Sequence, residues 1–184
     1  MKATDQLRAE HDGILTMLQI LERITEQMGS GKEANLDHLD QIVEFLQVFA
    51  DKCHHGKEED FLFPALEKVG IPRQGGPIGV MLSDHDQGRK YIRAMREALE
   101  ELKKGRDGKD AFAGAARGYI ELLRSHIMKE NDVLFVMGDR NLPEEQQSRL
   151  LEDFETLEKE KIGVGKHEAF HRLMDELGSV YLAL

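Results

Sequence analysis

Two stretches of the sequence repeat one another, and this internal repeat limits the possible fold more than any other feature. The stretch HHGKEEDFLFP, which begins at His54, aligns with HIMKENDVLFV, which begins at His126. An earlier histidine precedes each stretch, His11 by 43 residues and His85 by 41 residues, and both stand between acidic residues. The repeat predicts two similar helical hairpins, each with a lone His on one helix and His-x-x-x-Glu on the next.

Apolar residues recur at helical spacing through almost the whole chain, and no strand pattern competes with them. The sequence has no Trp and only 4 Pro, and Leu, Glu, Lys and Ala are common, which favours helix. We expect helices at about 4–28, 36–68, 77–104, 109–137, 143–161 and 166–181, with Pro64 kinking or interrupting the second one. The predicted fold is all-α: one domain over 1–184, with an up-down four-helix bundle at 1–140 and two additional C-terminal helices at 141–184.

The repeated groups have the spacing of metal ligands. Residues at i and i+4 share a helix face, so His54 and Glu58 can reach one metal region, as can His126 and Glu130. A buried cluster of imidazoles and carboxylates is costly unless cations neutralise it, and this donor set suits iron, manganese or zinc. Two carboxylates that can bridge favour two metal ions. The predicted ligands from the repeat are His11, His54, Glu58, His85, His126 and Glu130.

Two adjacent pairs in the first hairpin are ambiguous, because His55 follows His54 and Glu59 follows Glu58. Matching to the second hairpin selects His54 and Glu58 as the inward-facing groups. On an α-helix the next residue lies about 100° round the axis, so we expect His55 and Glu59 to face solvent.

The ordered pattern H…HxxxE…H…HxxxE, followed by an apolar stretch, resembles the hemerythrin-like family, also called the HHE cation-binding domain. The resemblance covers about His11 to Met137. It implies a hemerythrin-like bundle that holds two irons per chain with an oxo or hydroxo bridge; zinc and manganese are the alternatives. It further implies that Glu58 and Glu130 bridge the irons and that the terminal ligands are His11, His54, His85 and His126.

The sequence departs from the oxygen carriers of this family in two ways. Those proteins place a second His four residues after the third-helix His, where this chain has Arg89, and an Asp five residues after the last-helix His, where this chain uses Glu at i+4. The family's iron-centre repair proteins share the pattern but carry an N-terminal cysteine-bearing module that this sequence lacks. We expect a fifth imidazole to come from His167, which forms an HxxxH pair with His171.

These residues predict a non-haem di-iron protein that binds O₂, NO or peroxide as a sensor, store or detoxifier. The alternatives are a di-iron enzyme for peroxide reduction or iron-centre repair, and a redox-silent metal store or zinc-binding protein. The sequence offers no dedicated acid–base group or substrate pocket, which favours binding over dedicated enzymatic turnover. The expected partners are a small diatomic ligand or peroxide and an unidentified electron donor; monomer and homodimer both stay open.

Charge and composition exclude several other classes of protein. The formal net charge of −10 disfavours nucleic-acid binding. No apolar run approaches the ~20 residues of a membrane-spanning helix, and the N-terminus lacks the apolar stretch of a signal peptide. The single cysteine, Cys53, cannot form an intrachain disulfide. We therefore expect a cytoplasmic protein.

Overall fold

The computed structural model describes residues 1–163 and 165–182, and these contain helices and no strand. The predicted all-α fold is confirmed. The bundle helices are α1 (Ala3–Gly29), α2 (Leu36–Phe45), α4 (Pro77–Lys103) and α5 (Lys109–Lys129). Both α2 and α5 are prolonged by π-helical turns and short α-helices: η1 (Leu46–His55), η2 (Glu58–Leu62) and α3 (Phe63–Lys68) after α2, and η3 (Glu130–Leu134) and α6 (Phe135–Asn141) after α5. The remaining elements are α7 (Glu144–Leu157), η4 (Glu158–Ile162) and α8 (Lys166–Tyr181).

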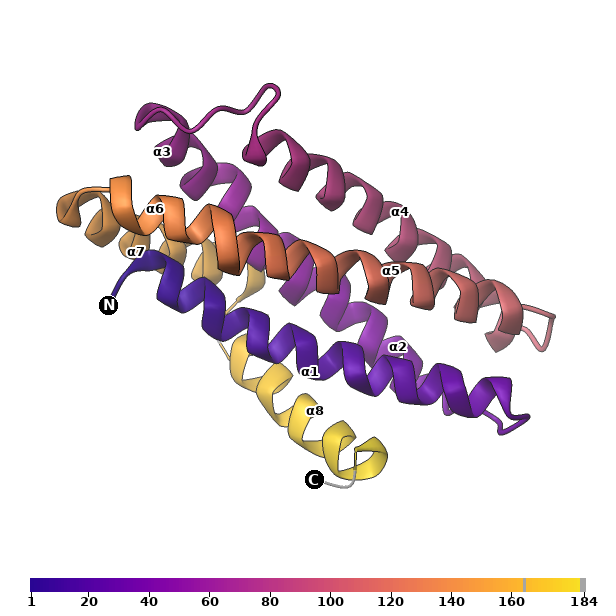
Figure 1. The fold of residues 1–184 in the computed structure, drawn as a ribbon. Coiled ribbons are helices and arrows are strands. Elements are labelled where there is room, and N and C mark those ends of the chain that lie inside the picture. The colour runs from indigo at the N-terminus through magenta and orange to yellow at the C-terminus, as the bar shows by residue number, and fades with distance from the viewer. Residues whose placement is uncertain (164, 183–184) are drawn as a thin grey trace.

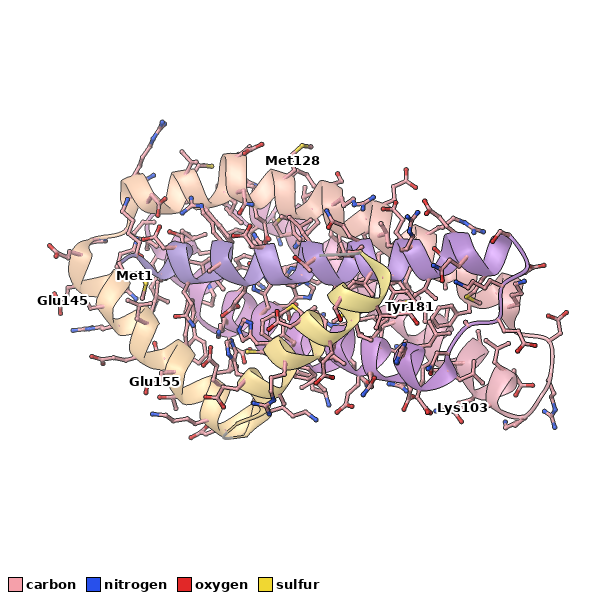
Figure 2. The ribbon with its side chains drawn as sticks, turned by 90° about the horizontal axis from the view of Figure 1, so that it is seen from below. Met1, Lys103, Met128, Glu145, Glu155 and Tyr181 are labelled. Atoms are coloured by element: carbon pink, nitrogen blue, oxygen red, sulfur yellow. The ribbon has the colours of Figure 1, made fainter. Side chains whose placement is uncertain are left out.

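The four long segments run alongside one another in an up-down bundle (Figure 1). Helix α5 packs against both α1 and α4, and α4 also packs against α2 and η1. Met1 and Glu145 lie near one end of the bundle and Lys103 lies at the other (Figure 2). None of the described helices is long and apolar enough to cross a membrane.

The two C-terminal helices cover different parts of this bundle. Helix α8 crosses the face of α1 (Figure 2), and its Phe170 ring meets the Phe45 ring of α2 edge-on, with the ring centroids 5.4 Å apart. Helix α7 packs against α1 and η2 and buries Phe154 in the core at the end of the bundle where α1 begins. The segment beyond the bundle therefore closes one side and one end of it.

The apolar core is divided into two clusters. Along α1, Leu7 belongs to the smaller cluster and Ile14 to the larger one; along α5 and η3, Leu123 belongs to the larger cluster and Leu134 to the smaller one. The segment between each pair contains buried histidine and glutamate side chains. A polar layer thus crosses the middle of an otherwise apolar bundle, and its buried charges require partners.

The second bundle helix continues through Pro64 without a loop, because Pro64 lies in the first turn of α3, where a missing backbone N–H is tolerated. The regular α-helix is interrupted earlier, by the π-helical turns η1 and η2. Turns of this kind occur frequently at functional sites. Here η1, η2 and η3 contain four of the side chains of the polar layer: His54, His55, Glu58 and Glu130.

Candidate metal centre

The polar layer consists of five histidines and two glutamates, each at most 2% exposed. Their possible ligand atoms fall into two groups, and within each group these atoms lie within 4.8 Å of one another. We call them the His11 group and the His55 group. The His11 group contains His11, His54, Glu58 and Glu130; the His55 group contains His55, Glu58, His85 and His126. The structure therefore brings together all six groups predicted from the repeat and adds His55.

Each carboxylate reaches an imidazole of both groups. Glu58 lies 3.5 Å from Nε2 of His54 through Oε1 and 3.3 Å from Nε2 of His85 through Oε2. Glu130 Oε2 lies 3.2 Å from Nε2 of His126 and 3.1 Å from Nε2 of His11. The two sets of contacts correspond under the sequence repeat. Both carboxylates thus have the position of bridging ligands between two metal ions.

All five imidazoles direct Nδ1 outward to a side-chain oxygen and Nε2 inward. In the two halves of the repeat, His54 Nδ1 faces Glu10 at 2.8 Å, and His126 Nδ1 faces Asp84 at 3.3 Å. The remaining pairs are His11 with Asn131 at 2.8 Å, His85 with Glu59 at 2.7 Å and His55 with Asp51 at 3.4 Å. An oxygen at Nδ1 fixes the tautomer that leaves Nε2 free as a metal ligand, and such partners are typical of metal-bound histidines.

Most of the buried polar atoms that lack a hydrogen-bond partner are inward-facing atoms of this cluster. Among the described residues, nine buried side-chain atoms lack a hydrogen-bond partner, and seven of them belong to this cluster. They are Nε2 of His11, His54 and His55 and both carboxylate oxygens of Glu58 and Glu130. Burial also lowers the pKa of His54, His55 and His85 to about 3, so these imidazoles are neutral near pH 7. Neutral imidazoles and unpartnered carboxylates fit a pair of cations.

The protons bound to the remaining groups compete with a metal. Burial acts against a charge on His126, but the carboxylates of Glu130 and Asp84 outweigh it and raise the pKa of His126 to about 9. Burial and the neighbouring Glu130 carboxylate raise the pKa of Glu58 well above its ordinary value. Because a metal ligand must be deprotonated, binding at these groups releases protons.

His55 does not face solvent as expected from an α-helical position. It is 2% exposed, and its ring stacks on the His85 ring with the centroids 3.8 Å apart. The wider π-helical turn η1 reduces the angle between consecutive side chains, so His54 and His55 both point into the bundle. Glu59 is also not fully exposed: its side chain is 25% exposed and accepts the hydrogen bond from His85.

A family model, described as the hemerythrin HHE cation binding domain, matches residues 2–137. This chain belongs to the hemerythrin HHE cation-binding domain family. The family predicted from the sequence is thereby confirmed, and the matched segment contains every residue of the two groups.

Several curated relatives share part of this hemerythrin-type segment. The iron-sulfur cluster repair protein YtfE of Enterobacter sp. (strain 638) is 35% identical over 86 residues. The proteins of the same name from Salmonella paratyphi B and Salmonella newport (strain SL254) are each 34% identical over 86 residues. Each match covers 45% of this chain and 39% of the relative, so the chain matches less than half of their length. No solved structure matches the chain at a significant level.

The predicted fifth ligand, His167, lies outside both groups of the described residues. It belongs to α8, beyond the segment matched by the hemerythrin family, and its ring centroid lies 5.5 Å from the Phe49 ring and 4.7 Å from the His171 ring. Helix α8 packs against α1. The fifth imidazole that the structure places in the cluster is His55.

Outside the histidines, cations face their carboxylate partners. Lys57 is completely buried and forms ion pairs with both Glu10 and Glu158, the latter from η4. At the matching position of the repeat, Lys129 pairs with Asp84 at 2.6 Å and remains 36% exposed. The carboxylates that face His54 and His126 are therefore each paired with a lysine.

Proposed function

We propose that the protein holds two iron ions in this cluster and binds O₂, NO or peroxide there as a sensor, store or detoxifier. The observation that supports the proposal best is the arrangement of five inward Nε2 atoms around two carboxylates that each reach both groups. Nitrogen and carboxylate ligands in a bundle core suit iron. A single tetrahedral zinc ion would take only one group of four and leave the other group without a metal.

In the proposed centre, His11 and His54 would hold one iron, and His55, His85 and His126 would hold the other. Glu58 and Glu130 would be shared, since each contacts an imidazole of both groups. A reduced di-iron pair held there would bind a diatomic ligand and supply the electrons to activate it. The Phe135 ring stacks on the His11 ring with the centroids 5.4 Å apart, and the Phe63 ring stacks on the His85 ring with the centroids 5.8 Å apart. On the side of the smaller core cluster, apolar side chains therefore limit the access of water to the centre.

We further propose that 141–184 belongs to the same domain.

The proposal predicts a spectral response. Protein loaded with two irons per chain and reduced anaerobically should change its visible absorption when O₂ or NO is added, in proportion to the iron content. The Glu58→Gln protein, which lacks an ionised bridge, is the control and should show no such change. If the loaded wild-type protein gives the same spectrum before and after both gases, the proposed function is wrong.

A second candidate, repair of iron centres, is favoured by the partial similarity to proteins named iron-sulfur cluster repair proteins. In that case the loaded protein should restore the activity of an enzyme with a damaged iron-sulfur cluster, and the Glu58→Gln protein should not. Steady turnover of peroxide by the loaded protein would instead indicate a peroxide-reducing enzyme.

The ligand set itself is tested by comparing two histidine variants. His55→Ala should lower the iron content from about two to about one per chain, because the His55 group loses an inward imidazole. His167→Ala should leave both the iron content and the absorption spectrum unchanged, since His167 contacts Phe49 and His171 instead of the cluster. Elemental analysis of both proteins measures the difference, and the reverse pattern would restore His167 as a ligand.

A further inference from the structure

The two sides of the centre differ at one set of four positions. On the side where η1 meets α4, these positions carry polar residues, and on the opposite side, where α5 and η3 meet α1, the repeat places apolar or neutral residues. Asp51, His55, Glu59 and Arg89 on the first side match Leu123, Ile127, Asn131 and Leu15 on the second. Asn131 faces Nδ1 of His11 as Glu59 faces Nδ1 of His85, but the other three positions are apolar on the second side, so contacts among all four polar residues are particular to the first side.

Arg89 connects the polar residues of the first side. Its Nε donates to Asp51 Oδ1 at 2.9 Å, and its Nη2 donates to Glu59 Oε1 at 2.6 Å. Asp51 in turn faces Nδ1 of His55 at 3.4 Å, and Glu59 accepts from Nδ1 of His85 at 2.7 Å. One guanidinium therefore holds the two carboxylates that orient two stacked imidazoles of the same metal group.

We propose that Arg89 is a positioning residue that holds His55 and His85 in ligand geometry through Asp51 and Glu59. The inference rests on the proposed metal-binding function and adds to it a residue outside the ligand set. The planar fork of arginine presents several donors in fixed directions, whereas the ammonium of lysine is a point charge that cannot span both carboxylates in the same way. Geometry, and not positive charge alone, is what this position requires.

If Arg89 formed only an ordinary surface ion pair, its removal would leave metal binding unchanged. The Arg89 side chain is 34% exposed, and ion pairs with this exposure contribute little to stability. Arg96 supplies a matched control on the same helix: it is 33% exposed and pairs with Asp40 at 2.5 Å, but none of its ion pairs reaches the cluster. Removing either arginine should change folding stability little, and only the removal of Arg89 should change metal binding.

The test is a titration of the metal-free protein with Co²⁺, whose visible absorption reports its coordination. Wild-type protein and Arg96→Met should bind two equivalents with the same spectrum. Arg89→Met should bind one equivalent normally and the second about 10–100-fold more weakly, with altered bands, as expected when a group that orients a ligand is lost. Arg89→Lys should resemble Arg89→Met, because it retains the charge and lacks the fork. Thermal unfolding of each metal-free protein checks the fold.

The possible results separate this inference from the proposed function. If wild-type protein binds two equivalents and Arg89→Met binds both as tightly as Arg96→Met does, the positioning role is refuted and the metal centre stands. Full recovery by Arg89→Lys, or equal loss of both equivalents in Arg89→Met, refutes it as well. If wild-type protein binds fewer than two equivalents, both proposals fail. Should Arg89→Met not fold, Arg89→Lys decides the question.

Discussion

Glu58→Gln should yield a folded protein that retains almost no metal. Glu58 belongs to both metal groups, so its loss removes a ligand from each. The neutral amide that replaces it is a weak ligand, and we expect the affinity for both ions to fall at least about 100-fold, beyond the effect of losing a residue that only orients a ligand. Elemental analysis and competition with a chelator measure this loss.

The same substitution should not weaken the metal-free protein. Burial and the nearby Glu130 carboxylate raise the pKa of Glu58, which means that an ionised Glu58 is unfavourable without cations. An amide of the same shape removes that repulsion, so the metal-free variant should be at least as stable as the wild type. Glu67→Gln is the control, because Glu67 pairs with Arg73 outside the cluster, and it should bind metal normally. Unchanged metal content in Glu58→Gln would exclude Glu58 as a bridging ligand.

Lys57→Met should lower the free energy of unfolding by about 3–5 kcal/mol, the range expected when one partner of a buried ion pair is removed. The Lys57 ammonium is fully buried between Glu10 and Glu158, and methionine fills a similar volume without the charge. The Glu10 side chain, only 5% exposed, then keeps its contact with Nδ1 of the neutral His54 but has no cation to balance its charge. Urea unfolding of the metal-free protein measures the loss.

The repeat supplies a matched control for this prediction. Lys129→Met breaks the corresponding pair with Asp84, but the Lys129 side chain is 36% exposed and should cost only about 1 kcal/mol. Adding Glu10→Gln to Lys57→Met should restore part of the stability, because it removes the unpaired charge. If the two lysine variants unfold at the same urea concentration, the buried ion pairs of Lys57 stabilise the protein no more than the exposed ion pair of Lys129.

Most of the fold could be predicted because local signals agreed along the chain. Pro77 begins α4 and the spacing of apolar residues defines α1 and α8, so helix positions followed from sequence. The repeat then paired the hairpins, and the structure brings the six predicted groups together. The match also extends to outer residues, since Glu10 and Asp84 occupy equivalent places beside His54 and His126.

His55 was missed because the same repeat pointed away from it. Its counterpart is Ile127, and on an α-helix it would lie on a different face from His54. Neither the repeat nor α-helical geometry indicates the π-helical turn that η1 forms. The one available signal was the combination of the His54–His55 doublet with Arg89 at a position where the family's oxygen carriers place a ligand. Sequence alone did not show that Arg89 reaches Asp51 and Glu59.

The composition of the two metal groups has a consequence for how the chain unfolds. Each group takes ligands from both hairpins: Glu130 joins the first hairpin's residues in one group, and His85 and His126 join them in the other. Bound ions therefore act as cross-links between the halves, and neither hairpin can unfold alone without releasing both metals. Helix α8 contributes no residue to either group, so bound ions do not hold it, and its attachment depends on apolar contacts such as that of Phe170 with Phe45.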